Sequence, residues 1–419
     1  MDIQSLIDEI GRKAKAASRK LARLDTAAKN RVLLAMADRL IAASPEILAA
    51  NAKDLKGARA AGVSSAMIDR LALDAKRVAA MADGIRSVAG LVDPVGKLLA
   101  DWTRPNGIRI SKVRVPIGVI GIIYESRPNV TSDAAVLCIK TGNAVILRGG
   151  SESIHSNVAI VAALQVGGAE AGLPPDCVQL IPVTDRDAVR TMAQADRFID
   201  LIVPRGGHAL IEAVVQHARM PVIKHYHGVC IVYADKEADL DMAERIIVNA
   251  KAQRPGVCNA AETLLVHRAI APAFLSRAGA ALRTKGVRFR ADAEAAAWIG
   301  GEVEPAAEAD WSTEYLDLIL AVKVVGDLDE AVEHIERYGS HHSDAIVTRD
   351  AAAAERFLNA VDSATVYWNA STRFTDGGEF GFGAEIGIST DKLHARGPMA
   401  LEELTTYKYQ IRGNGQVRE

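Results

Sequence analysis

The run Gly118-Val119-Ile120-Gly121-Ile122-Ile123 decides the fold of this 419-residue chain. A run without polar side chains is typical of a strand buried on both faces of a parallel sheet. Similar runs follow at residues 143–147, 178–181 and 201–203. Segments of helical length lie between them, around residues 152–171 and 185–195. This alternation predicts a doubly wound α/β domain.

The regions on either side of this domain have patterns of their own. Residues 1 to about 95 are rich in alanine and carry apolar stripes at helical steps, namely Ile3, Leu6, Ile7 and Ile10, then Val32, Leu33, Met36 and Leu40. A second block of alternating strands and helices runs from about Val229 to Trp368, with strands expected at 229–233, 263–266, 318–325, 344–348 and 365–368. The chain therefore predicts a helical start and two α/β domains.

Residues 101–115 predict a hairpin arm. Asn106-Gly107 is a turn dipeptide, and apolar residues flank it among polar ones. An exposed arm offers strand edges to a partner, so an oligomer contact is one expectation and an ordinary surface hairpin is the other. The tail at 401–410 alternates toward its end, which indicates a last strand that pairs with the arm or with another subunit.

One thiol stands out as a candidate nucleophile. Cys258 lies in Gln253-Arg254-Pro255-Gly256-Val257-Cys258-Asn259-Ala260, after a helical run at 240–250 that Pro255-Gly256 ends. A strand follows, so the thiol is expected on a tight loop. Backbone N–H groups there lower a thiol pKa and stabilise an oxyanion. The alternative is a buried structural cysteine.

Two loops after strands are suited to phosphate. They read Arg148-Gly149-Gly150-Ser151-Glu152 and Pro204-Arg205-Gly206-Gly207-His208. Glycines before a helix admit a ligand to the backbone, and arginine adds a fork of donors. Such loops are also ordinary turns, but the pair suits a dinucleotide with a 2′-phosphate. The glycine-rich stretch 381–387 misses the dinucleotide fingerprint and is interpreted as a loop that shapes the site.

Composition excludes several classes of protein. A net charge of −2 gives no general attraction to nucleic acid or anionic lipid. Four widely spaced cysteines without a CxxC pair favour a reducing cytoplasm, and no metal-ligand cluster is visible. No apolar run approaches the roughly 20 residues that span a bilayer, and the first residues lack a signal-peptide pattern. An enzyme in the cytoplasm that holds its anionic ligand locally is expected.

Five motifs connect the chain to a known family. They are residues 116–131, 140–143, the Pro-Arg-Gly-Gly loop, the Cys258 loop, and residues 338–348. With these motifs the whole chain resembles the aldehyde dehydrogenase superfamily, and within it the branch that reduces the acyl phosphate of glutamate in proline biosynthesis. The resemblance implies an aldehyde dehydrogenase-like α/β fold: a Rossmann-type cofactor domain, a catalytic domain and a β-hairpin oligomerisation arm.

The resemblance also implies domain borders, a cofactor and partners. The expected borders are 1–97 with 113–225 for the NADP-binding domain, 226–370 for the catalytic domain, 98–112 with 391–419 for the arm and tail, and 371–390 for the site-shaping loop. NADPH is the implied reductant and L-glutamyl 5-phosphate the implied substrate. A homo-oligomer, and association with glutamate 5-kinase, are the expected assemblies.

One departure from the wider superfamily bears on the chemistry. Hydrolytic members carry Glu-Leu-Gly-Gly-Lys, whose glutamate activates water, whereas the matching region here is Lys224-His225-Tyr226-His227-Gly228-Val229. A reductase is expected to lack that base, because water would waste the activated acyl group. A CoA-acylating enzyme would also lack it, so that alternative stays open, as does a catalytically retired binding protein.

The remaining site residues follow from the resemblance. Asn129 matches the oxyanion asparagine by location, although the backbone N–H of Cys258 is an alternative donor. Glu314 resembles the glutamate that holds the nicotinamide ribose, or else it is a surface acid. Arg127 is expected to receive the leaving phosphate.

The α-carboxylate of the substrate is expected to bind Thr372, Arg373 and Thr375. Each arginine has a structural ion pair as its alternative. His341 and His342 are adjacent at the start of a strand, so they point to opposite faces. They are expected to shape the cleft rather than to bind metal.

Overall fold

The computed structural model describes residues 2–393 and 395–418. The chain divides into two compact units. Unit 1 contains Met1–Lys224, Gly381–Gly387 and Met399–Glu419, and unit 2 contains His225–Phe380 and Ile388–Pro398. Each unit has its own sheet and its own apolar core. Among the described helices, none is both long enough and apolar enough to cross a bilayer.

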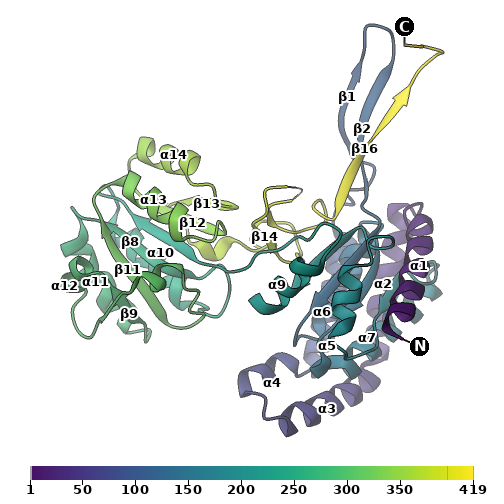
Figure 1. Ribbon diagram of the computed structural model, residues 1–419, viewed down its shortest axis with the longest axis horizontal. Coiled ribbons are helices and arrows are strands. Elements are labelled where there is room, and N and C mark those ends of the chain that lie inside the picture. Colours follow the sequence, from purple (N-terminus) through teal and green to yellow (C-terminus); the bar gives the residue numbers. More distant parts are fainter. Residues whose placement is uncertain (1, 394, 419) are drawn as a thin grey trace. The chain divides into compact units, whose positions relative to one another are not determined.

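Unit 1 is built on a four-stranded parallel sheet in the order β5-β4-β3-β6. Its strands are β3 (Val119–Tyr124), β4 (Ala144–Arg148), β5 (Val178–Leu180) and β6 (Leu201–Arg205). All four coincide with the predicted apolar runs. Since side chains on both faces of these strands are buried, the sheet must be covered on both sides, and Figure 1 shows helices around it.

The helices of unit 1 include the predicted N-terminal region. Their bounds are α1 (Ile3–Leu21), α2 (Thr26–Ala42), α3 (Ser44–Ala60), α4 (Ser65–Leu71), α5 (Ala75–Gly90), α6 (Asn129–Lys140), α7 (Ile154–Glu170), α8 (Asp187–Ala193) and α9 (His208–His217), with a short 3₁₀ turn, η1 (Ser151–Ser153). The predicted stripes face inward: Ile7 and Leu33 are buried completely or almost so. Helices α1, α8 and α9 share one core with the sheet.

Unit 2 is built on a seven-stranded parallel sheet in the order β10-β9-β11-β8-β7-β12-β13. Its strands are β7 (Cys230–Ala234), β8 (Ala261–His267), β9 (Arg288–Ala291), β10 (Glu304–Pro305), β11 (Ile319–Val325), β12 (Ser343–Val347) and β13 (Thr365–Trp368). The five predicted strands are confirmed. Strand β9 was not predicted, because charged Arg288 and Arg290 alternate with buried Phe289 and Ala291 in a short segment near the sheet edge.

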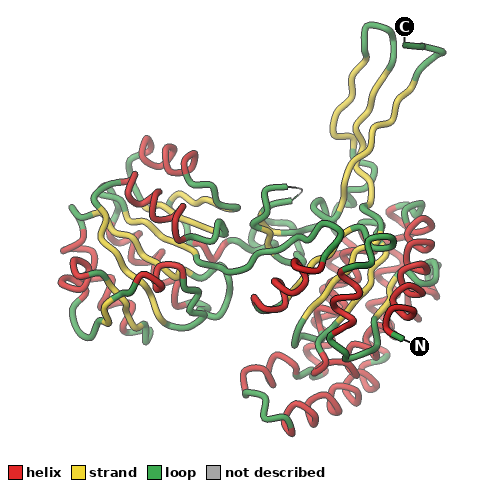
Figure 2. The backbone as a smooth tube through the Cα atoms, viewed as in Figure 1, coloured by secondary structure: helices red, strands yellow, loops and turns green. Residues whose placement is uncertain are grey.

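Helices pack against this sheet from segments between its strands. Their bounds are α10 (Leu240–Ala252), α11 (Ala271–Arg283), α12 (Ala293–Ile299), α13 (Leu328–Tyr338) and α14 (Ala351–Ala360), with 3₁₀ turns η2 (Glu308–Ser312) and η3 (Thr372–Phe374). A small antiparallel pair, β14 (Ile388–Ser389) with β15 (Gly397–Pro398), completes the unit. Figure 2 shows the alternation of helix and strand in this unit.

The predicted hairpin arm is a three-stranded antiparallel sheet. Strand β2 (Arg109–Pro116) lies between β1 (Leu98–Thr103) and β16 (Thr405–Arg412). Of the two expectations for the tail, pairing with the arm of the same chain is the one observed, with Thr405 opposite Pro116 and Arg412 opposite Arg109. The arm projects from the helical part of unit 1 (Figure 1).

The segment 371–398 is divided differently from the expected borders. Residues up to Phe380 and from Ile388 to Pro398 pack with unit 2, whereas Gly381–Gly387 pack with unit 1. Lys392 and Arg396 form ion pairs with Asp362, which ties the second piece to unit 2. A separate site-shaping loop at 371–390 and a tail that begins at 391 are therefore not the natural division.

Candidate active site

Cys258 lies on the loop between α10 and β8, as predicted. Asp239 caps the start of α10 by accepting the Met242 N–H at 3.0 Å, and the helix ends before Pro255. Cys138, Cys177 and Cys230 are buried, whereas Cys258 is partly exposed. Burial raises the pKa of the Cys177 thiol to about 12. Of the four cysteines, Cys258 is therefore the one placed to react, which argues against the structural alternative.

The loop fits closely against Gly228. A Cβ at that position would lie 1.8 Å from the Cys258 carbonyl oxygen, so only glycine is accommodated. The N–H of Gly228 donates to Glu314 Oε1 at 2.9 Å. Glu314 is half-buried, and that burial raises the pKa of its carboxyl. The surface-acid alternative for Glu314 therefore does not fit, and its expected role at the nicotinamide ribose stays a prediction.

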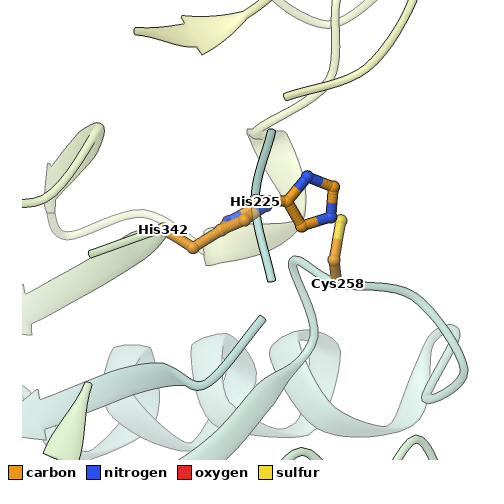
Figure 3. Close-up of side chains that lie close together, drawn as sticks. All are labelled: His225, Cys258 and His342. Atoms are coloured by element: carbon orange, nitrogen blue, oxygen red, sulfur yellow. The ribbon is translucent and has the colours of Figure 1, made fainter. Parts of the chain in front are cut away.

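Two histidines flank the thiol. Among the described residues, the ligand atoms of His225, Cys258 and His342 all lie within 4.8 Å of one another. Figure 3 shows the His225 ring against the sulfur. His225 Nδ1 lies 2.8 Å from the Ile388 carbonyl oxygen. Because a carbonyl only accepts, Nδ1 carries the proton, and Nε2 of the neutral ring presents its lone pair.

His342, the third residue of this cluster, is fully buried. Its Nδ1 lies 2.8 Å from Ser343 Oγ and 3.6 Å from Cys230 Sγ. Its Nε2 has no hydrogen-bond partner within the described part of the chain. Burial, and then the electrostatic effect of the neighbouring His225, lower the pKa of His342 well below its usual value, so the ring is neutral.

The sequence did not assign chemistry to either of these histidines. His225 lies in the segment that replaces the water-activating glutamate, and that location was the available signal. His342 was expected only to shape the cleft, and the structure brings it to the nucleophile. Its neighbour His341 has a different partner, the Asp362 carbonyl oxygen at 3.0 Å, and is outside the cluster.

Asn259, which follows Cys258 in the loop between α10 and β8, connects that loop to η3. Its carbonyl accepts from Thr372 Oγ1 at 2.7 Å, its Oδ1 accepts from Arg373 Nη1, and its Nδ2 donates to the Thr375 carbonyl at 2.8 Å. The side chains of Thr372 and Thr375 are fully buried. The three residues expected to hold the α-carboxylate are thus contacts of the loop itself, a function that sequence reasoning missed.

Arg373 has a second contact within the loop. Its Nε donates to Gln253 Oε1 at 2.9 Å. Burial, and then the neighbouring charge of Arg254, lower the pKa of Arg373. Two guanidinium groups therefore lie near the thiol, where an anionic substrate would need them.

Unit 1 contains a pocket of about 1020 Å³ near the carboxyl ends of β3 and β4. Its lining carries four cationic side chains, Lys53, Arg148, Arg186 and Arg190, and four carboxylates, Asp54, Glu125, Glu152 and Asp187. Two of these carboxylates accept hydrogen bonds from the backbone: Asp54 accepts from the Ser156 N–H at 2.8 Å, and Glu152 accepts from the Ser126 N–H at 2.6 Å. The size of the pocket fits a dinucleotide, and its arginines are suitable donors to phosphate.

The first predicted phosphate loop borders this pocket through Arg148, Gly150 and Ser151. Arg148 Nη1 donates to the Gly149 carbonyl at 2.9 Å, and its buried Nε has no partner among the described atoms. A Cβ at Gly149 would lie 2.1 Å from the side chain of Asn157, and one at Gly150 would lie 2.2 Å from Glu152. A side chain at either glycine would force its polar neighbour to move, so packing inside unit 1 favours glycine at both positions whatever ligand binds.

The second loop is arranged differently. Its Gly207 N–H donates to Glu125 Oε2 at 2.9 Å, and a Cβ at Gly206 would lie 2.4 Å from the same carboxylate. Pro204 and Arg205 end β6, and the Arg205 guanidinium lies beside Gly387. The pocket is lined instead by Ala209 and Leu210 of the following helix, α9.

Two further expected residues belong to unit 1. Asn129 starts α6, and its Nδ2 donates to Asp133 Oδ2 at 2.8 Å. Arg127 is exposed on the loop before that helix. Their expected roles at the thiol of unit 2 stay predictions.

The sequence and the fold match known proteins over the whole chain. The model of the aldehyde dehydrogenase family matches residues 3–316. The chain belongs to the aldehyde dehydrogenase family. The Moorella thermoacetica protein named gamma-glutamyl phosphate reductase is 56% identical over 419 residues, which cover all of both chains. The Paramagnetospirillum magneticum protein of that name is 55% identical over 417 residues, all of this chain and 98% of its own.

A solved member of the aldehyde dehydrogenase family has nearly the same fold. The crystal structure of gamma-glutamyl phosphate reductase from Thermotoga maritima superposes with a TM-score of 0.97 at 47% identity, covering 99% of this chain and 100% of its own. The predicted fold class and family resemblance are confirmed. The CoA-acylating alternative is not favoured by these relatives.

Proposed function

We propose that this chain is a glutamate-5-semialdehyde dehydrogenase that acts as an NADPH-dependent reductase of L-glutamyl 5-phosphate, yielding L-glutamate 5-semialdehyde and phosphate. The partly exposed thiol of Cys258, facing an imidazole lone pair, is the observation that carries the proposal. The full-length identity to proteins named gamma-glutamyl phosphate reductase supports the substrate.

Cys258 starts the reaction as the nucleophile. His225 Nε2 accepts the thiol proton, and the thiolate attacks the acyl carbon. The carbon–sulfur bond forms, the carbon–oxygen bond to phosphate breaks, and phosphate leaves. Arg127, Arg254 and Arg373 are the cations proposed for the phosphate and α-carboxylate of the substrate.

The thioester on Cys258 must then be protected from water until it is reduced. The segment 224–229 offers no carboxylate for activating water. Bound NADPH supplies the hydride that brings the acyl group to the aldehyde level. The carbon–sulfur bond then breaks, and Cys258 recovers its proton from His225. The Cys258 backbone N–H and Asn129 are the proposed donors to the oxyanion.

The cofactor is proposed to occupy the pocket of unit 1. Arg148, Gly150 and Ser151 lie at its border, and Lys53, Arg186 and Arg190 line it. The arginines of this lining support NADPH over NADH, because a guanidinium group can bind the additional 2′-phosphate. Glu314 in unit 2 is proposed for the nicotinamide ribose, and the Pro204–Gly207 loop for support of α9.

Exposed apolar residues on the arm support a homo-oligomer. Trp102, Tyr409 and Ile411 are each more than a third exposed. An apolar strand edge of this kind is usually covered by another chain.

Association with glutamate 5-kinase, which would transfer the labile acyl phosphate to this enzyme, stays a prediction.

The reverse reaction tests the proposed function. Reduction of NADP⁺ by glutamate 5-semialdehyde should require inorganic phosphate, should be lost in Cys258→Ala, and should be slower with NAD⁺. Turnover without phosphate would mean that water releases the acyl enzyme. Activity of Cys258→Ala would show that the nucleophile is another residue. Ordinary, slow alkylation of Cys258 together with no turnover would favour a retired binding protein.

A further inference from the structure

The cluster around Cys258 has the composition of a transition-metal site. One thiolate and two neutral imidazoles are ligands that Zn²⁺ prefers. All three residues belong to unit 2, and their ligand atoms lie within 4.8 Å of one another. Zinc bonds of about 2.3 Å to sulfur and about 2.0–2.1 Å to nitrogen place tetrahedral ligand atoms about 3.5 Å apart. The three ligand atoms would therefore need to approach one another by only about 1 Å to bind Zn²⁺.

The orientation of the His225 ring supports metal binding. The N–H of His225 Nδ1 donates to the Ile388 carbonyl at 2.8 Å. Histidine ligands of metals are commonly held through a carbonyl on the other ring nitrogen in this way. The contact leaves the Nε2 lone pair directed away from the backbone, toward the thiol (Figure 3).

His342 supplies an independent observation. Its side chain is completely buried, and its Nε2 lacks a hydrogen-bond partner among the described residues. Its Nδ1 is held by Ser343 Oγ, which itself contacts Thr375 Oγ1 at 2.6 Å. A buried nitrogen without a hydrogen-bond partner is destabilising unless something binds it. A cation at the cluster would satisfy this atom.

The geometry points to an inhibitory Zn²⁺ site formed by Cys258 Sγ, His225 and His342. Three protein ligands leave a fourth position for water or substrate. Binding replaces the thiol proton by the metal: the proton leaves to solvent, and the sulfur lone pair forms the bond to zinc. The same lone pair attacks the acyl phosphate, so an enzyme with zinc bound is inactive.

This inference rests on the proposed function only for the inhibition, and the binding can be measured without substrate. Metal-free full-length protein would be titrated with Co²⁺, which substitutes for Zn²⁺ and gives a thiolate charge-transfer band when sulfur binds it. We expect one Co²⁺ per chain with that band, displacement by Zn²⁺, and protection of Cys258 from iodoacetamide.

Matched variants identify the ligands. Cys258→Ser should abolish the charge-transfer band. His225→Asn keeps a donor for Ile388 but lacks the Nε2 ligand, so it should weaken Zn²⁺ binding about tenfold or more. His227→Asn, two residues away on the exposed side of the same segment, should bind as the wild type does. A circular dichroism spectrum of each variant checks the fold.

The outcomes separate the two proposals. Absence of the thiolate band in wild type, or equal Zn²⁺ affinity in wild type and His225→Asn, would overturn the site. If wild type binds Co²⁺ through Cys258 but does not oxidise glutamate 5-semialdehyde, the metal site is supported and the proposed function is refuted. Zinc inhibition that EDTA reverses in wild type, at one Zn²⁺ per chain, completes the expected result.

Discussion

At the scale of single residues, the environment of Cys258 is made by neighbours that are distant in sequence. His225 faces the sulfur, with its tautomer set by the Ile388 carbonyl. Asn259 is held on three sides by the η3 segment. A residue held by several hydrogen bonds loses little further entropy in the transition state, so the loop that carries Cys258 is already ordered before substrate binds.

Replacement of His225 tests its role as proton acceptor. In His225→Asn, the amide can still donate to the Ile388 carbonyl, but the base is lost. We expect kcat/KM to fall by about 10²- to 10⁴-fold. Alkylation of metal-free Cys258 by iodoacetamide should slow as well, which a purely structural role would not require. His227→Asn is the control, and an unchanged alkylation rate in His225→Asn would contradict the prediction.

At the scale of elements, a buried ion pair connects α10 and β8, the helix and the strand on either side of the Cys258 loop. Lys251 on α10 and Glu262 on β8 are 2.5 Å apart, and neither side chain has any exposure. Burial raises the pKa of Glu262 to about 7 and lowers the pKa of Lys251, while each partner's charge opposes the shift. The pair fixes where the loop leaves the helix and enters the sheet.

Breaking this pair should destabilise unit 2. Lys251→Met leaves Glu262 buried without its cation, and the expected loss is about 3–5 kcal/mol of unfolding free energy. The double variant Lys251→Met with Glu262→Leu removes both charges and should recover most of the loss. Urea unfolding followed by circular dichroism measures both variants. A single variant as stable as wild type would show that the pair contributes nothing.

The 388–398 segment should be sensitive to acid. Lys392 and then Arg396 lower the pKa of Asp362 to about 2. Because the folded pKa lies below the unfolded one, this contribution to stability is full above about pH 4 and is lost as pH falls through about 2. Asp362→Asn should therefore be less stable than wild type at pH 6 and equal to it near pH 2. Thermal unfolding across that range measures the difference, and an equal gap at both pH values would refute the assignment.

At the scale of the whole molecule, two units carry different halves of the proposed chemistry. Unit 2 holds the thiol of Cys258, and unit 1 holds the pocket proposed for the cofactor and the arm. On the arm, Trp102 lies opposite Ile110 and Ile110 opposite Ile411, while the Trp102 and Tyr409 rings meet edge to face at 6.2 Å. These side chains form an apolar cluster on one face of the arm, and Lys112, which lies opposite Tyr409, interrupts that face.

Disruption of that face should dissociate the oligomer. Tyr409→Lys with Ile411→Lys places two charges among the exposed apolar side chains, and the molar mass by light scattering should fall to that of one chain. Thr406→Lys adds a charge to the opposite face of the same strand and should leave the mass unchanged. An oligomer that survives the double variant would place the interface elsewhere.

The sequence by itself determined the parallel sheets and singled out the candidate nucleophile. Strands such as β3 and β4 are apolar throughout, a pattern that only burial on both faces allows, and Cys258 is signalled by the residues beside it. The strand β9, with its alternating arginines, lacks that pattern. Only the tertiary structure decided that His225 and His342 meet at the thiol and that Thr372, Arg373 and Thr375 hold its loop. Periodicity reports which face of an element is buried, whereas contacts between loops depend on how the strands are ordered in space.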